Sequence, residues 1–198
     1  MIRLRDRLKR AVLILAVAVP LVTAVPSTPQ FAWRYGLHFE QYIYAPDRAA
    51  IEAELEYLYA VLPGLERLNI RICTVGQTGQ VLGLYDTQTN TIYIYALTAT
   101  KLWYFPWFLN CWSIATAHEV GHAVWFRAFT EAERREYVRL TGATDPVEGF
   151  AEDFRLLFGS ERGRYSWPPR PELKAAEQVR ALIVSAVGGE QCATLNGS

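Results

Sequence analysis

The sequence is poor in several residue types that mark familiar protein classes. Among its 198 residues are three histidines, three cysteines and one methionine, with no internal repeat and no low-complexity tract. The lack of repeats argues against a solenoid or propeller, and three cysteines without CxxC spacing argue against a cysteine-built metal site. We expect at most one disulfide among Cys73, Cys111 and Cys192, and the sequence does not indicate which two would pair.

The chain also lacks an excess of charge of either sign. Lys and Arg together number 20, as do Asp and Glu, but five of the basic residues lie within residues 1–10. Residues 25–198 therefore hold 15 basic and 19 acidic residues, a net charge of −4. This mildly acidic balance predicts no nucleic-acid partner. Hydrophobic residues make up 51% of the chain, which is enough apolar material for a folded core and argues against wholesale disorder.

Long hydrophobic runs are absent except near the N-terminus. There the basic residues 1–10 precede an apolar run, residues 11–24. As a helix this run would extend roughly 21 Å, short of the ~30 Å of a hydrocarbon core, and its end at Val22-Thr23-Ala24 suits a signal peptidase. We therefore expect residues 1–24 to be a signal peptide, with an uncleaved N-terminal anchor as the alternative. Residues 25–198 would form one domain that is secreted or lies in the cell envelope.

Hydrophobic periodicity predicts an α+β fold for this domain. The order is a strand at 37–44, a helix capped at Asp47 and ending near Leu62, a strand at 69–75, and a hairpin of strands 81–85 and 91–95. Four helices then follow, at about 110–129, 130–141, 145–158 and 172–187. Their ends carry standard signals: a Thr130/Glu133 capping box, Gly142 as a stop, and Asp145 as a cap before Pro146.

One segment, residues 96–112, is unusually aromatic. It would be either a loop packed over the core or an apolar surface for substrate or membrane. Apart from the N-terminal segment, it is the only place where we expect membrane contact.

The chemistry is concentrated in the HEVGH sequence of residues 118–122, an HExxH motif. Positions i and i+4 of a helix share a face, so His118 and His122 can both point at one ion. Glu119 lies beside them, where it can accept a proton from water activated by that ion. The third histidine, His38, is distant in the sequence, and we expect no role for it in the site.

A catalytic zinc takes three protein ligands and keeps an open position for water. No histidine follows His122, so the third ligand should be a carboxylate, and Glu148 and Glu152 are one helical turn apart. If Glu148 binds the metal, Glu152 can accept the ring N–H of a ligand histidine. If Glu152 were the ligand, the residue one turn later would be Leu156, which cannot accept a hydrogen bond from a histidine. This favours Glu148 as the ligand. The alternative is that Glu148 only completes a capping box with Asp145, which needs no metal.

HEVGH followed by EGFAEDF, residues 148–154, resembles the gluzincin metallopeptidases, and in particular the group of anthrax lethal factor and the bacterial Pro-Pro endopeptidases. The resemblance covers about residues 70–160. It implies a zincin-like fold, in which a small β-sheet with an edge hairpin packs on the active-site helix and the C-terminal part is mainly helical. It also implies one Zn²⁺ bound by His118, His122 and Glu148, with Glu119 as general base and Glu152 supporting a zinc-binding histidine.

The sequence departs from this family at one position. The family usually has a Tyr seven residues before the ligand Glu to stabilise the oxyanion, and Thr141 stands there. Tyr137 or Tyr165 would have to take that role, although neither matches the pattern. Residues 142–149 also partly match the aspzincin pattern, which makes Asp145 a rival ligand.

The expected function is that of an exported zinc-dependent endopeptidase acting on a peptide or protein substrate. The hairpin, residues 83–95, resembles the edge-strand region of zincins, which implies that it binds the substrate by strand addition. Two alternatives stay open. One is a catalytically weak module that holds zinc without cleaving anything. The other is a membrane-associated interaction module that uses the aromatic segment and carries an accidental HExxH.

Overall fold

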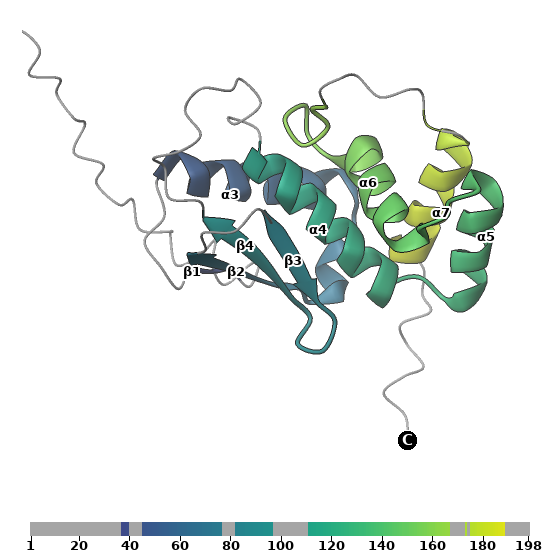
Figure 1. Cartoon of the computed structure of the whole chain (residues 1–198), viewed down its shortest axis with the longest axis horizontal. Coiled ribbons are helices and arrows are strands. Elements are labelled where there is room, and N and C mark those ends of the chain that lie inside the picture. Colours follow the sequence, from purple (N-terminus) through teal and green to yellow (C-terminus); the bar gives the residue numbers. More distant parts are fainter. Residues whose placement is uncertain are drawn as a thin grey trace, which may run out of the picture.

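The computed structural model describes residues 37–39, 45–76, 82–96, 111–166, 173 and 175–188. Strands and helices are mixed, so the predicted α+β class is confirmed (Figure 1). The elements are β1 (Leu37–Phe39), α3 (Ala45–Val61), the 3-10 helix η1 (Leu65–Leu68), β2 (Arg71–Gly76), β3 (Gly83–Asp86), β4 (Thr91–Ala96), α4 (Cys111–Arg127), α5 (Glu131–Thr141), α6 (Pro146–Phe158) and α7 (Ala176–Gly188).

The strands form one four-stranded sheet in the order β1-β2-β4-β3. β1 and β4 both pair with β2 in parallel, whereas β3 pairs antiparallel with β4. The predicted hairpin is therefore present, with Tyr85 opposite Ile92. Among the strands that the structure describes, β3 is an edge strand and has a strand partner on one side only.

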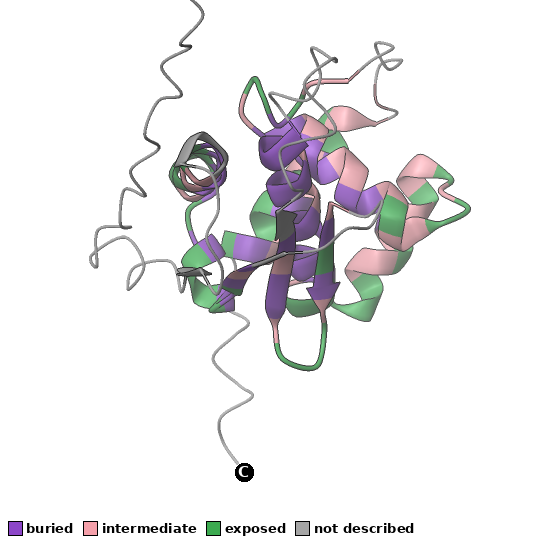
Figure 2. Cartoon of the chain, turned by 60° about the vertical axis from the view of Figure 1, so that its left-hand side comes forward, coloured by how far each residue is buried: buried purple, intermediate pink, exposed green. Residues whose placement is uncertain are grey.

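Helix α4 is the centre of the fold. It packs on β3 and β4, on α3 and on α6, and the helices α5, α6 and α7 form a group to the right of it in Figure 1. Thirteen of its 17 residues are buried, which explains why its sequence is apolar nearly all round. Buried residues gather where α4 faces the strands (Figure 2), so the HExxH motif lies on a helix whose position is set from several sides.

Helices α4 and α6 approach each other closely at Gly121. A Cβ atom at this position would lie 2.8 Å from Cα of Ala151. This distance is too short for a Cβ atom, so glycine at this position, opposite the small Ala151, allows the two helices to pack closely. This close packing brings the first turns of α6 beside the HExxH motif.

The predicted ends of α5 and α6 agree with the structure. Thr130 and Glu133 form a capping box, and Gly142 ends α5 with a φ of 70°. Asp145 caps α6 through its side chain, and Pro146 begins the helix. These signals act over a few residues, which is why they could be interpreted from sequence alone.

Some boundaries differ from the prediction. Helix α3 begins at Ala45, so Asp47 lies inside it; Pro46 is tolerated in the first turn because its missing N–H has no helical partner there. Strand β2 begins at Arg71 rather than at Asn69, which has a φ of 50° and ends η1.

Several predictions fall outside the described residues. They concern the signal peptide at 1–24, the end of the strand expected at 37–44, most of the aromatic segment 96–112, and Cys192. The predicted start of the last helix near residue 172 is wrong, because α7 begins at Ala176 and the preceding Ala175 has a φ of 55°, which is not that of a right-handed helix. Within the described ranges, no helix has the length and apolar character needed to span a membrane.

Candidate metal centre

The two histidines of the HExxH motif lie one turn apart on α4, at the cleft side of the helix. Their ring centroids are 4.8 Å apart and the rings meet edge to face. The side chain of His122 is the more buried of the two. The two rings therefore face the same region, as the spacing of four residues on a helix predicts.

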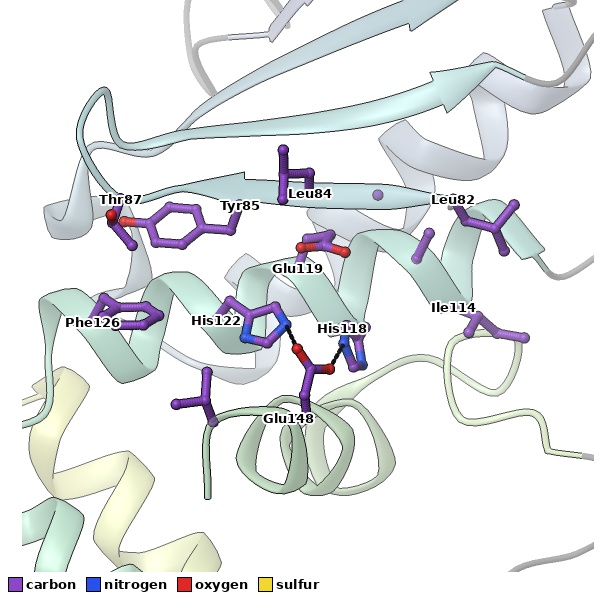
Figure 3. A pocket seen from close by; sticks show the side chains of 13 residues that line it. Leu82, Leu84, Tyr85, Thr87, Ile114, His118, Glu119, His122, Phe126 and Glu148 are labelled. Carbon is purple, nitrogen blue, oxygen red and sulfur yellow. Dashed lines mark ion pairs between the residues drawn. The ribbon is translucent and has the colours of Figure 1, made fainter. Parts of the chain in front are cut away.

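Glu148, in the first turn of α6, reaches both histidines of α4 from this neighbouring helix. Its Oε2 atom lies 3.3 Å from Nε2 of His118, and its Oε1 atom lies 3.4 Å from Nε2 of His122 (Figure 3). The ligand atoms of the three residues all lie within 4.8 Å of one another. The structure thus brings together the three residues that the sequence singled out for metal binding.

This donor set fits a single zinc ion. Two imidazole nitrogens and one carboxylate oxygen are common ligands of catalytic zinc, and bond lengths near 2.1 Å put neighbouring donors of a tetrahedral site about 3.3–3.5 Å apart. The two nitrogen-to-oxygen distances here are 3.3 and 3.4 Å. Each histidine therefore stands at such a separation from one oxygen of Glu148, and the ligand atoms of all three residues lie within 4.8 Å of one another.

Glu119 is buried between α4 and the edge strand. A Cβ atom at Gly83 would lie 2.6 Å from Oε1 of Glu119, so the glycine leaves the space that this carboxylate occupies. Its other oxygen, Oε2, is buried and has no hydrogen-bond partner among the described residues. Because a buried polar atom without a partner is costly, this oxygen is suited to a proton, a water molecule or a substrate group in the cleft.

The electrostatics around Glu119 favour its protonated form in the metal-free protein. Burial raises its pKa to about 7, and the negative charge of Glu148 adds to this effect. The charge of His118 and a hydrogen bond from the backbone N–H of Tyr85 act in the opposite direction. A bound cation would add a positive charge next to Glu119 and favour the ionised form.

The two histidines differ in their electrostatic surroundings. Burial lowers the pKa of His118, but its hydrogen bond to Glu152 and the nearby carboxylates outweigh this, so the net shift is upward. Burial and the charge of His118 lower the pKa of His122, although Glu148 and Asp145 oppose them. His122 is therefore held toward the neutral form, which is the form that binds a metal.

Glu152 lies behind the histidines, one turn after Glu148 on α6. Its Oε2 atom is 3.5 Å from Nδ1 of His118, the ring nitrogen that does not face Glu148. The same carboxylate is bound on its other side by Arg155. Glu152 therefore lies beside His118, as the sequence predicts, and is not one of the three residues grouped for metal binding.

A cleft of about 630 Å³ opens in front of these residues. The hairpin forms one wall, and α4 and the start of α6 form the other (Figure 3). In Figure 3, Phe126 lies toward one end of the cleft, and Leu82 and Ile114 lie toward the other; Leu84 and Val147 add to its apolar lining. The histidines and the two carboxylates, Glu119 and Glu148, lie between these ends.

The remaining acidic candidate, Asp145, acts as a helix cap. Its Oδ1 atom accepts a hydrogen bond of 3.3 Å from the backbone N–H of Glu148. The side chain of Glu148 itself turns to the histidines. Within the described residues the group suited to a metal does not include Asp145.

Tyr137 does not lie in the cleft, which corrects the oxyanion-stabilising role considered from the sequence. Its ring is 1% exposed and packs against Trp125 and Phe150. Its hydroxyl donates a hydrogen bond of 2.8 Å to Asp153, and burial raises its pKa further above the ordinary value. The apolar face of α5 must be buried against the neighbouring helices, and Tyr137 belongs to that face.

Two other residues considered from the sequence lie elsewhere. His38 is on β1, at the opposite edge of the sheet from β3. Tyr165 follows α6, and its backbone carbonyl accepts a hydrogen bond from Arg155.

Sequence reasoning missed two arginines that organise the surroundings of the site. One of them is Arg155, which binds the carboxylate of Glu152. Arg127, in the last turn of α4, donates to the hydroxyl of Tyr85 at 3.2 Å and to the carbonyl of Thr87 at 3.1 Å, and so fastens the hairpin to the helix. Glu152 and Arg155 have the i,i+3 spacing of an ordinary surface ion pair, and only the burial of Arg155 distinguishes it.

Comparison of the chain with protein-family models, with curated proteins and with solved structures finds no match.

Proposed function

We propose that this chain is a zinc-dependent endopeptidase with a zincin-like active site. The observation that carries the proposal is the carboxylate of Glu148, which reaches Nε2 of both histidines from a second helix. If the HExxH motif were accidental, there would be no reason for a carboxylate from another helix to lie next to both of its histidines.

His118, His122 and Glu148 would hold one Zn²⁺. When bound, this ion supplies Lewis acidity, polarising a peptide carbonyl and lowering the pKa of water toward about 7. Glu148 is the most exposed of the three, so the group faces the cleft and is accessible to a substrate. Glu152 would keep the ring of His118 in the tautomer that leaves Nε2 free to bind.

Glu119 would act as the general base. It lines the same cleft as the two histidines, and its Oε2 atom has no other hydrogen-bond partner among the described residues. A carboxylate in this position can take a proton from attacking water and pass it to the leaving amine. The close approach of Gly83 restricts where the side chain can go, which favours a defined position for proton transfer.

The edge strand suits a peptide substrate. Strand β3 runs along the cleft and pairs with β4 on one side only among the described strands. A peptide could add to its open side through main-chain hydrogen bonds, and its apolar side chains would meet Leu84 and Phe126. The N-terminal segment supports a substrate in the cell envelope or outside the cell.

The antiparallel edge strand, the HExxH helix beneath it and a glutamate from a later helix together support the zincin-like interpretation. A catalytically weak zinc-binding module is the second candidate. It is favoured by one observation, because Tyr137 faces the core and supplies no hydroxyl to the cleft.

A peptide-library experiment separates these two functions. The full chain, loaded with zinc, is incubated with a broad mixture of peptides, and new termini are identified by mass spectrometry. We expect cleavage, preferentially beside apolar residues. Glu119→Gln should reduce the rate by about 10²–10⁴-fold while keeping the zinc, since it removes the proton acceptor but no ligand. A parent that binds zinc and cleaves nothing would support the weak module instead.

A further inference from the structure

Arg155 is a buried cation next to the proposed metal site, and only 4% of it is exposed. It lies one turn after Glu152 on α6. Nε of Arg155 donates to Oε2 of Glu152, and Nη2 donates to Oε1, each at 2.5 Å. This two-pronged contact fixes the plane of the carboxylate as well as its position, which a lysine could not do.

The third nitrogen of the guanidinium is also engaged. Nη1 of Arg155 donates to the backbone carbonyls of Gly163, at 2.8 Å, and of Tyr165, at 3.1 Å. All three nitrogens therefore have partners, two on the carboxylate and one on the turn that follows α6. The head group cannot swing away from Glu152 without breaking its contacts to that turn.

The turn itself is held by a buried glutamate from a distant helix. Glu54, on α3, is 1% exposed and accepts hydrogen bonds from the backbone N–H of Ser160, at 2.9 Å, and from the hydroxyl of the same residue. A Cβ atom at Gly163 would collide with the carboxylate of Glu54. The glycine therefore lets the turn close over Glu54, and its carbonyl is then available to Arg155.

We propose that Arg155 is a positioning residue, which holds Glu152 against Nδ1 of His118 and is itself held by the turn 160–165 on Glu54. Oε2 of Glu152 is shared between Nε of Arg155 and Nδ1 of His118, 3.5 Å away. The inference rests on the proposed metal site, because the orientation of His118 is what the contact controls. Partners of this kind behind a metal ligand change metal affinity by about 10–100-fold.

The test measures zinc affinity in the full chain by competition with a chelator. Arg155→Met removes the donors and keeps much of the side-chain length. We expect it to weaken zinc binding about tenfold, and Arg155→Lys to recover only part of this loss because it cannot bind both oxygens. In a Glu152→Gln background the same Arg155→Met change should have no further effect, since Arg155 acts through Glu152.

Arg180→Met is the matched control. Arg180, on α7, also binds α6, through the carbonyl of Leu157 at 2.8 Å and the ring of Phe158, but it does not contact Glu152. A loss of general stability should appear in both variants by thermal unfolding. A loss of zinc affinity should appear only with Arg155→Met.

A second readout needs no metal. The Nδ1 proton of His118 can be followed by NMR in the metal-free chain, which has only three histidines. Arg155→Met should shift this resonance and Arg180→Met should not. Unchanged zinc affinity and an unchanged resonance in folded Arg155→Met would overturn the inference, as would equal losses of affinity in both arginine variants. If the parent bound no zinc, the proposed function would fall, and the resonance would still decide whether Arg155 positions Glu152.

Discussion

Glu119 combines burial with an adjacent group of metal-binding side chains. In the metal-free protein its pKa is raised to about 7, mainly by burial. The carboxylate therefore opposes folding when it is ionised, and a bound cation relieves this penalty. This gives the residue a measurable signature that does not depend on any substrate.

The stability of the metal-free protein should depend on pH through Glu119. Its folded pKa of about 7 lies above the unfolded value of 4.5, so the folded state holds the proton more tightly. The contribution of Glu119 to stability is therefore fully present below pH 4.5 and is lost as the pH rises to about 7. At about 1.4 kcal/mol for each pH unit between the two values, the loss is of the order of 3 kcal/mol.

Urea unfolding of the metal-free parent and of Glu119→Gln, from pH 4 to 8, measures this effect. The unfolding free energy of the parent should fall relative to that of Glu119→Gln as the pH rises from 4.5 to about 7, since glutamine does not titrate. Two parallel pH profiles would contradict the burial of Glu119 as described.

The packing of α4 against α6 determines whether the site can form. Glu148 and Glu152 come from α6, whereas the histidines come from α4, so the separation of these two helices controls the distances between the carboxylates and the histidines. Gly121 sits at the closest approach, where an added Cβ atom would lie 2.8 Å from Cα of Ala151.

Gly121→Ala should therefore separate the helices. We expect a loss of about 1–3 kcal/mol in stability from overpacking, although alanine has the better helix propensity by about 1 kcal/mol. Zinc affinity should fall as well, because Glu148 moves away from the histidines. Chemical denaturation and chelator competition measure the two effects.

Gly149→Ala is the control for this change. Gly149 is also a helical glycine and is next to Glu148, but a Cβ atom there would lie 3.4 Å from the hydroxyl of Tyr137, close to an ordinary contact. Gly149→Ala should leave stability and zinc affinity nearly unchanged, or raise stability slightly. If Gly121→Ala behaved in the same way, the close helix contact would not be what sets the site.

The elements themselves were largely predictable where their signals are local. The Thr130 capping box, Gly142 and the Asp145-Pro146 start of α6 act within one turn, and the structure agrees with each. The predicted start of α3 is wrong because Asp47 resembles a cap, while Pro46 already fits the first turn. The hydrophobic pattern predicts Asn69 as part of the strand because it carries no sign of the positive φ that this residue adopts.

Across the whole molecule, the spacing of residues along two helices predicted which side chains would meet, but not what supports them. His118 and His122 are one turn apart, as are Glu148 and Glu152, so helical geometry alone suggests their faces. The strand order β1-β2-β4-β3 depends on pairings that no local signal fixes. The burial of Tyr137 and the contact between Glu54 and Ser160, 106 residues apart, arise from tertiary packing in the same way.

The molecule as a whole is arranged around the region where α4, α6 and the edge of the sheet meet. Strand β3 and the start of α6 lie on opposite sides of the HExxH helix in Figure 3. Three separate parts of the chain thus contribute to one cleft, and the proposed function requires that a metal ion be bound between two of them.

The most direct measurement is the zinc content of the purified full chain by elemental mass spectrometry, after zinc has been offered and the excess removed. We predict one zinc per chain in the parent. Glu148→Ala should lose it, and Glu136→Ala should keep it, since Glu136 is a half-buried glutamate on α5 that pairs with Arg139 and is not part of the metal-binding group. A folded parent without zinc, or a Glu148→Ala variant that holds as much zinc as the parent, would contradict the account.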